Sequence, residues 1–506
     1  MALYAGVDCG TQSTKVLIID SDSAQILGQG SAPHQLINEA NGRREQLANW
    51  WTEALEESFK QALINAQISG SEIVALAVSG QQHGFVPLDI EGNVLTPVKL
   101  WCDTESADEN EEIIDLLGGK SKAMSQLGIL PQTGYTLSKI LWFKKNHPEK
   151  WKKLNSVLLP HDYLNYWLTG CLVAEYGDAS GTGLLNVKCK EWDKYTADKI
   201  DPEGRLWNAL PKLVKANSFI GTIKPNIAKK LGLSTQTKVS SGGGDNMMAA
   251  IGTGNIKPGI TTMSLGTSGT LFTYTDTPIK TSNEMIANFC SSNNGWLPLI
   301  CTMNVTSATT KIRQLFNLDI EAFNEALQLS PPGAEGVMML PFFNGERVPP
   351  LPHAQASLHC LNHENLTPQN LSMAVVESAT YGLKFGLDLF REQGLSMNEI
   401  RLTGGGSRSP VWRQIVADIT NTQVVCVANE EGAALGAALQ SIWCDYLDKG
   451  KGNINPELCL SDICNKFVHL NENTRMYPDP ARVNIYQDLY SEYIKLLKFE
   501  HPKVNI

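Results

Sequence analysis

Two short glycine–threonine turns in this sequence have the composition of phosphate-binding sites. Gly10-Thr11 and Gly266-Thr267 each separate two runs of β-forming residues. Glycine lets backbone amides approach an anion closely, and threonine adds a hydroxyl donor. Asp8 and Lys15 flank the first turn, so a carboxylate for the water shell of a metal ion and a cation for a phosphate group are both present. Two ordinary hairpins with polar turns are the alternative that these residues leave open.

A third segment places an acidic side chain beside consecutive glycines. The run Gly242-Gly243-Gly244-Asp245-Asn246 lies between the strand-like pair Val239-Ser240 and the helical residues Met247 to Ala250. Consecutive glycines cost backbone entropy, so they indicate the close approach of a ligand or of another chain segment. An enzyme that phosphorylates a hydroxyl group needs a carboxylate to accept its proton, and Asp245 could be this base. The other role that aspartate favours at such a position is that of a helix N-cap.

Two further segments could bind a nucleoside and a sugar. Thr403-Gly404-Gly405-Gly406-Ser407 ends a strand-like run and precedes a helical run from Val411 to Ile419. Such a turn can admit adenine and ribose against the backbone, although a tight turn without a ligand has the same composition. Gln81-Gln82-His83-Gly84 follows the apolar run Ile73 to Val78, and its polar side chains could bind sugar hydroxyls. A lone histidine is more often a structural residue, which is the alternative here.

The elements that must position these residues alternate between strands and helices. The apolar run Ile73 to Val78 follows apolar residues at helical spacing, namely Trp51, Leu55 and Phe59. A similar helix-to-strand order leads to the run Ile400 to Thr403 in the second half of the chain. This alternation predicts an α/β protein.

The two glycine–threonine turns also suggest that the fold is duplicated. Aligning Asp8 with Ser264 brings Gly10-Thr11 onto Gly266-Thr267 and, beyond the turns, Thr14 onto Thr270. Each half of the chain then begins with a strand, a Gly-Thr turn and a second strand, which is typical of a duplicated fold.

Length and composition exclude several classes of protein. A chain of 506 residues is expected to form two or more domains, and 42% apolar with 19% charged residues is typical of a globular protein. The formal net charge of −10 gives no footprint for nucleic acid or for an anionic membrane, and no apolar run is long enough for a membrane span. The eleven cysteines contain no C-x-x-C pair, which predicts free thiols and a cytoplasmic location. The composition is compatible with a monomer or a homodimer.

The order and spacing of these motifs resemble the FGGY family of carbohydrate kinases over essentially the whole chain. The segment from Gly134 to Asn146 fits the first signature of that family at every constrained position. The segment from Ala356 to Glu377 fits the second signature, except that Cys360 stands where the pattern has glycine. The resemblance implies two actin-like (ribonuclease-H-like) domains with a central cleft. It further implies a sugar-binding domain at 1–250 and a nucleotide-binding domain at 251–506.

The same resemblance gives the motif residues roles in magnesium-dependent transfer from ATP. Asp245 is expected to be the catalytic base and Asp8 to organise the metal ion through water. The other expected nucleotide contacts are made by the two turns, the third glycine-rich turn and the residues beside them: Thr11, Lys15, Gly266, Thr267, Gly404, Gly405 and Ser409.

The expected sugar contacts follow the xylulokinase branch of the family. The pair Gln82-His83 is similar to the sugar-binding motif of that branch, and Asp103 and Asn246 are expected to hold further hydroxyls. An arginine often follows the aspartate by two residues, but this chain has Glu105. The expected reaction is the phosphorylation of D-xylulose to D-xylulose 5-phosphate. The alternatives are a kinase for another ketose or polyol such as D-ribulose, and a non-catalytic protein that binds sugar or nucleotide.

Overall fold

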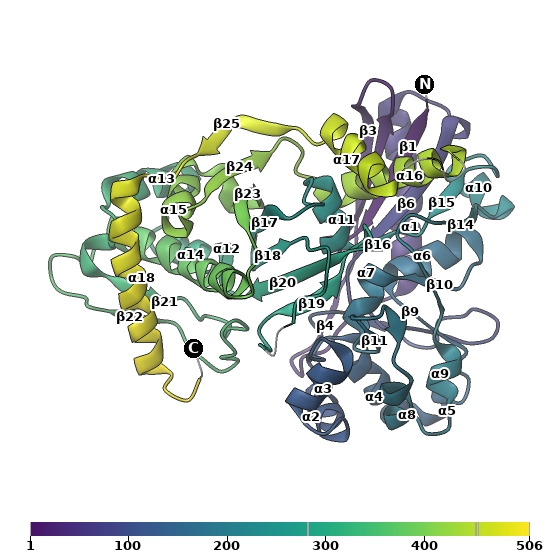
Figure 1. The fold of residues 1–506 in the computed structure, drawn as a ribbon, viewed down its shortest axis with the longest axis horizontal. Coiled ribbons are helices and arrows are strands. Elements are labelled where there is room, and N and C mark those ends of the chain that lie inside the picture. The colour runs from purple at the N-terminus through teal and green to yellow at the C-terminus, as the bar shows by residue number, and fades with distance from the viewer. Residues whose placement is uncertain (1, 281–282, 451–452, 454, 505–506) are drawn as a thin grey trace.

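The computed structural model describes residues 2–280, 283–450, 453 and 455–504. Two seven-stranded mixed sheets form the framework of this part of the chain, with helices packed on their faces (Figure 1). The first sheet has the strand order β14-β15-β6-β1-β2-β3, and β16 also pairs with β6. Its strands are β1 (Leu3–Cys9), β2 (Ser13–Asp20), β3 (Gln25–Pro33), β6 (Ile73–Gly80), β14 (Phe219–Thr222), β15 (Lys238–Ser240) and β16 (Gly243–Gly244).

The second sheet has the strand order β19-β20-β18-β17-β23-β24-β25. Its strands are β17 (Gly259–Leu265), β18 (Gly269–Thr273), β19 (Ala287–Cys290), β20 (Trp296–Thr302), β23 (Met397–Thr403), β24 (Gln423–Val427) and β25 (Leu470–Met476). The strands predicted from apolar runs at Ile73 to Val78 and Ile400 to Thr403 are therefore confirmed as parts of β6 and β23.

Each sheet contains the same three-strand unit. β1 is antiparallel to β2 and parallel to β6, and β17 is likewise antiparallel to β18 and parallel to β23. This agrees with the predicted duplication, but the predicted alignment is wrong beyond the turns. Lys15 lies opposite Asp8, whereas Thr270 lies opposite Ser264. Because the second turn is one residue shorter, Thr270 corresponds to Lys15 and not to Thr14.

Helices from both halves of the sequence cover the first sheet. Alternate residues of a strand face opposite sides of a sheet, and β1 accordingly buries Leu3, Ala5 and Val7 against α1 (Ala48–Ala66). The other face, with Tyr4, packs against α16 (Gly432–Gly450) and α17 (Pro456–Phe467), which come from the second half of the chain (Figure 1). The predicted division of the chain between residues 250 and 251 stays a prediction.

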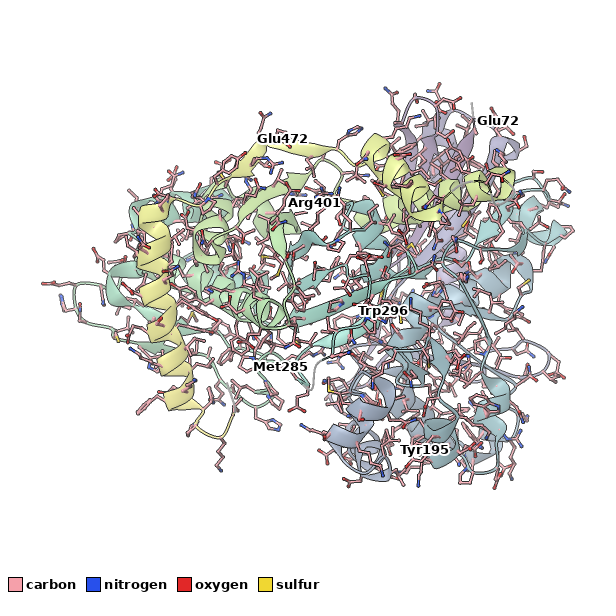
Figure 2. All side chains as sticks on the ribbon, viewed as in Figure 1. Glu72, Tyr195, Met285, Trp296, Arg401 and Glu472 are labelled. Carbon is pink, nitrogen blue, oxygen red and sulfur yellow. The ribbon has the colours of Figure 1, made fainter. Side chains whose placement is uncertain are left out.

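The second sheet has its own helices and also reaches the first half of the chain. The helices packed around its core include α12 (Thr306–Leu315), α13 (Ile320–Leu329), α14 (Pro368–Glu392), α15 (Pro410–Thr420) and α18 (Pro480–Glu500). Trp296 of β20, labelled in Figure 2, donates its indole N–H to the Val187 carbonyl oxygen at 2.7 Å. Lys190 lies over the same ring, 3.8 Å from its centroid. Strand β20 therefore links the second sheet to residues 187–190 in the first half of the chain.

Two other composition-based predictions can be compared with the structure. All eleven cysteines are free, as predicted, although Cys189 and Cys360 are exposed. Within the described ranges, no helix combines the length and the apolarity that crossing a bilayer requires.

The helices α11 (Asp245–Gly252) and α16 lie close enough for their backbones to touch. A side chain on Gly436 would overlap the Met248 carbonyl oxygen, and one on Gly252 would overlap the Gly432 carbonyl oxygen. The glycines of the small-residue run that begins at Gly432 therefore allow two backbones to touch.

We expect Gly436→Ala to lower the free energy of unfolding by about 1–3 kcal/mol, because the added methyl group has no space against α11. The matched control is Gly382→Ala in α14, where the nearest atom to the new methyl group would be Thr302 Cγ2 at 4.0 Å. Relief of glycine's helix penalty should leave that variant up to about 1 kcal/mol more stable. Thermal unfolding followed by circular dichroism measures both, and equal midpoints for the two variants would contradict the close contact.

Candidate active site

The first Gly-Thr turn carries an acid whose environment is set by burial. Asp8 is the second-last residue of β1, and its Oδ1 accepts a hydrogen bond from Ser79 Oγ at 2.8 Å. Burial raises the pKa of Asp8 to about 6, although the bond from Ser79 and the charge of Lys15 act in the opposite direction. The Oδ2 atom of Asp8 accepts no hydrogen bond from the residues that the structure describes. This oxygen is available to a metal ion or its water.

Lys15 lies beside this acid but is bound to a different partner. Its Nζ lies 2.7 Å from both carboxylate oxygens of Glu431, the residue immediately before α16. The predicted contact of Lys15 with phosphate stays a prediction, because in this structure an ion pair between the two halves of the chain already holds its charge.

Thr11 is held by the side chains of Gln81, Trp101 and Gln46. Its hydroxyl donates to Gln81 Oε1 at 3.1 Å and accepts from Trp101 Nε1 at 2.9 Å, while Gln46 Nε2 donates to its carbonyl oxygen at 2.8 Å. The Thr11 amide has no hydrogen-bond partner among the described residues. A phosphate oxygen could therefore bind this amide. The Thr11 hydroxyl is not available as a donor, because its hydrogen is already donated to Gln81.

Asp245 begins a helix but does not cap it. Gly244 is the N-cap of α11, and Asp245 Oδ1 instead accepts from the amide of Asn246 at 2.8 Å and from Asn246 Nδ2 at 3.1 Å. The N-cap alternative is therefore wrong, because a capping carboxylate would bond to an amide two or three residues further on. The Oδ2 atom has no hydrogen-bond partner within the described residues. Burial, followed by the charge of Asp8, raises the pKa of Asp245 to about 7.

The three glycines before this aspartate are packed by other chain segments. Gly242 has a φ of 71°, and a side chain there would overlap the Val78 carbonyl oxygen. Gln440 of α16 satisfies both backbone groups of Gly242, with Oε1 accepting its N–H at 2.9 Å and Nε2 donating to its carbonyl at 3.0 Å. Of the two explanations that the sequence left open, the approach of another segment accounts for Gly242.

A buried aspartate, Asp178, lies directly behind Gly244. The nearest atom to a side chain on Gly244 would be Asp178 Oδ1, at 2.9 Å. Asp178 bonds through Oδ2 to His161 Nδ1, and the pKa of Asp178 is raised well above its usual value by burial. The charge of Asp178 also contributes to the raised pKa of Asp245. Asp178 therefore favours the protonated form of the candidate base.

Three of the predicted sugar ligands meet beside Asp245. Asn246 Nδ2 donates to Gln82 Oε1 at 3.0 Å, whereas the buried Gln82 Nε2 has no partner among the described residues. His83 Nδ1 lies 2.7 Å from the Gly181 carbonyl oxygen, which can only accept, so Nδ1 carries the proton. Burial lowers the pKa of His83 to about 3, so the ring is neutral and its Nε2 is an acceptor. One free donor and one free acceptor suit a sugar hydroxyl.

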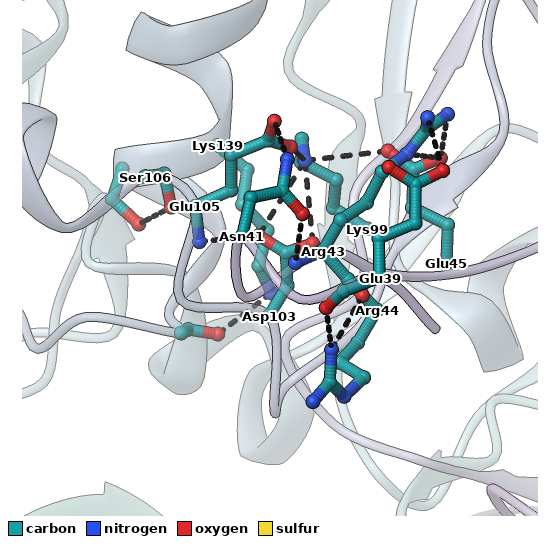
Figure 3. Close-up of polar contacts among 12 residues, drawn as sticks. Glu39, Asn41, Arg43, Arg44, Glu45, Lys99, Asp103, Glu105, Ser106 and Lys139 are labelled. Atoms are coloured by element: carbon teal, nitrogen blue, oxygen red, sulfur yellow. Dashed lines mark hydrogen bonds and ion pairs between the residues drawn. The ribbon is translucent and has the colours of Figure 1, made fainter. Parts of the chain in front are cut away.

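Asp103 is not in hydrogen-bond contact with these ligands. Its carboxylate accepts from the amides of Arg44 at 2.8 Å and Glu105 at 3.1 Å, and Lys99 Nζ lies 3.2 Å away (Figure 3). The side chain is fully buried. Because protein donors already fill most of its acceptor positions, direct binding of sugar by Asp103 stays a prediction.

The cluster in Figure 3 also gives Glu105 a role. Lys99 is shared by the carboxylates of Glu45, Asp103 and Glu105, and Asn41 Nδ2 donates to Glu105 at 3.0 Å. The three carboxylates are close enough together to hold a metal ion, but the ammonium group of Lys99 already balances part of their charge. Glu105 therefore fastens the segment after β8 (Val98–Lys99) to the segment around Asn41.

The nucleotide residues predicted on the second sheet lie next to one another. Gly404 has a φ of 81°, and a side chain there would come within 2.9 Å of the Gly266 amide nitrogen, so the two turns touch. A side chain on Gly405 would meet no atom within 4 Å, and Thr267 is exposed, which leaves space for a ligand. Ser409, in contrast, caps α15 by accepting from the Trp412 amide at 3.2 Å and also bonds to Asn324.

Sequence reasoning missed two side chains that hold His83. Tyr135 stacks on its imidazole ring with the centroids 4.4 Å apart. Lys139 of α4 (Thr136–Asn146) donates to the carbonyl oxygens of His83 at 2.8 Å and Gly134 at 2.7 Å. Burial lowers the pKa of Lys139 to about 7. Both residues lie within the first family signature, so their positions were marked, but their contacts were not.

These residues fit ATP with a magnesium ion. Magnesium prefers carboxylate oxygens, water and phosphate oxygens. Asp8 and Asp245 each have one carboxylate oxygen that no described residue binds. The free amide of Thr11 and the open Gly405 turn are suited to phosphate and nucleoside groups. These positions would hold the metal and the nucleotide.

Comparison with known proteins agrees with this chemistry. The N-terminal domain model of the FGGY family of carbohydrate kinases matches residues 3–252, and the C-terminal domain model matches residues 261–443. A xylulose kinase of Haemophilus influenzae is 50% identical over 496 residues, which are 97% of this chain and 99% of that protein.

Solved structures confirm the predicted α/β fold with two actin-like domains. A xylulose kinase from Bifidobacterium adolescentis has a TM-score of 0.82 at 28% identity and covers 96% of this chain and 99% of its own. A xyloylose kinase from Brucella ovis has a TM-score of 0.89 at 26% identity and covers 99% of both chains. The chain therefore belongs to the FGGY family of carbohydrate kinases and is, as its motifs predict, a sugar kinase.

Proposed function

We propose that this kinase transfers the γ-phosphoryl group of ATP to D-xylulose and forms D-xylulose 5-phosphate. The observation that carries the proposal is the contact of Asn246 with both Gln82 and Asp245, because it joins the sugar-binding pair to the candidate base. The names of the similar proteins from Haemophilus influenzae and Bifidobacterium adolescentis support the choice of sugar. Residues 1–250 would supply the sugar site and residues 251–506 most of the nucleotide site.

The sugar is held by groups that have unused hydrogen-bonding capacity. Gln82 Nε2 donates to one hydroxyl oxygen, and His83 Nε2 accepts from another hydroxyl. Asn246 orients Gln82 and lies next to the base. Because a ketopentose presents several hydroxyls in a fixed order, a donor and an acceptor at fixed positions select among sugars.

The chemical step requires one proton transfer and one displacement. Asp245 Oδ2 accepts the proton of the terminal hydroxyl as that oxygen attacks the γ-phosphorus, and the bond from phosphorus to the leaving ADP oxygen breaks. Gly266, Thr267 and the Thr11 amide hold the phosphates, and the turn at Gly404 and Gly405 holds the nucleoside. Asp8 orders the water around the metal. When bound, magnesium neutralises charge on the transferring phosphoryl group.

Activity against a panel of sugars tests the choice of substrate. We expect kcat/KM for D-xylulose to exceed that for D-ribulose, L-ribulose, glycerol and gluconate by about tenfold or more, which corresponds to about 1.4 kcal/mol of transition-state discrimination. A coupled assay of ADP release with magnesium-ATP measures each value. A higher value for any other member of the panel would overturn D-xylulose as the substrate.

Asp245→Asn tests the base. We expect kcat to fall by roughly 10²–10⁴-fold, because an amide cannot accept the proton, while ATP binding stays nearly unchanged. Steady-state kinetics and calorimetric titration with ATP measure the two effects. Asp20→Asn, at the far end of β2, is the control and should keep wild-type kcat. Full activity of Asp245→Asn would remove Asp245 from this role.

The pH dependence of kcat/KM provides a second test. The base acts in its ionised form, and burial raises the pKa of Asp245 to about 7. We therefore expect kcat/KM for the sugar to fall as the pH drops through about 7 and to level off at higher pH. Asp245→Asn should lose this acid limb. A wild-type profile that is flat between about pH 5 and pH 8 would contradict the assignment.

A further inference from the structure

Gln81 is a fully buried polar residue that the mechanism above does not use. It follows the last residue of β6 and directly precedes the sugar-binding pair Gln82-His83. Its side chain bonds to residues outside that pair. Its Oε1 accepts from the Thr11 hydroxyl at 3.1 Å, and its Nε2 donates to Gln46 Oε1 at 2.9 Å. Gln81 therefore connects the sugar loop with the phosphate turn between β1 and β2.

The contacts around Thr11 leave this residue little freedom. Its hydroxyl is bound on the other side by Trp101 Nε1, and its carbonyl oxygen by Gln46 Nε2. Gln46 is itself saturated, because its Oε1 also accepts from Trp51 and its Nε2 also donates to Gln35. A buried network of hydrogen-bonded polar side chains is internally rigid, so Gln81, Gln46 and Thr11 keep their positions relative to one another. The position of the Thr11 amide therefore depends on the side chains of Gln81, Trp101 and Gln46.

The same network is attached to the sugar site at two points. Gln82 is joined to Gln81 by a peptide bond and contacts Asn246 at 3.0 Å. The Trp101 carbonyl lies against Gly134, where it would overlap any side chain, and Gly134 precedes the tyrosine stacked on His83. Two routes therefore connect the sugar site with Thr11. The first runs through the Gln81-Gln82 peptide bond and the bond of Thr11 to Gln81. The second runs through the backbone contact of Gly134 with Trp101 and the bond of Trp101 to Thr11.

We propose that Gln81 is a positioning residue that couples sugar binding to nucleotide binding. Sugar that orders Gln82 would also hold Gln81, and through it the Thr11 amide, in the arrangement that binds the ATP phosphates. The coupling is reciprocal, so that ATP raises the affinity for sugar by the same factor. This inference rests on the proposed sugar and phosphate sites, but it concerns how the two sites communicate and not which sugar is used.

The test measures a ratio of affinities and not activity alone. Calorimetric titration with a non-hydrolysable ATP analogue and magnesium gives Kd without sugar and with saturating D-xylulose. In the wild-type protein we expect the sugar to lower this Kd by about fivefold or more. Gln81→Met keeps the length of the side chain but removes both of its polar groups. In this variant the ratio of the two Kd values should fall towards one. A loss of stability alone would change the folded fraction and leave this ratio unchanged.

The control variant is Gln126→Met, which removes a single hydrogen bond to Asp193 outside the site and should keep the wild-type ratio. If Gln81→Met does not fold, Trp101→Phe replaces it, because that change removes the second bond to the Thr11 hydroxyl and should also lower the ratio. A wild-type ratio of one, or a wild-type ratio retained in the variant that folds, would overturn the proposal. The sugar panel is a separate measurement, so a different preferred sugar would replace D-xylulose in the titration without deciding the coupling.

Discussion

The arrangement of the candidate active site depends on the close contact between α11 and α16. Two backbones can touch only where neither has a side chain, and Gly252 and Gly436 supply that space. Helix α16 comes from the second half of the chain and also covers one face of the first sheet. The contact therefore fixes α11 relative to that sheet. The same helix then satisfies the backbone of Gly242, and the residue before it, Glu431, neutralises Lys15.

Burial accounts for the unusual ionisation of the site. Desolvation is the largest cause of the raised pKa of both Asp8 and Asp245, and the charge of Asp8 raises the pKa of Asp245 further. Asp178, behind the glycine run, acts in the same direction on Asp245. A carboxyl group whose pKa lies near neutral pH is suited to accept a proton in the reaction and to release it afterwards. The packing that holds the glycine run together therefore also sets the chemistry of the proposed base.

Several side chains with predicted ligand roles turned out to have protein partners. The carboxylate of Asp103 is enclosed by Lys99 and two backbone amides, and the hydroxyl of Ser409 caps a helix. Gln81, which the sequence offered as one of the polar residues of the sugar motif, and Lys139, to which it gave no role, instead fix the loops that carry the proposed ligands. The residues that the sequence made conspicuous are thus divided between proposed ligands of the substrates and side chains that support those ligands.

The amino-acid sequence by itself determined the local elements and their order. Apolar periodicity and turn chemistry are properties of neighbouring residues, so the two hairpins, the strand before Gln81 and the helix after Asp245 could be predicted. Only the tertiary structure decided which residues far apart in sequence became partners. The packing of α16 brings Glu431 to Lys15 and Gln440 to Gly242. No local sequence pattern indicates that these residues, which are far apart in the chain, become partners. The one-residue difference between the two turns was likewise set by strand pairing, because register depends on the partner strand and not on the turn sequence alone.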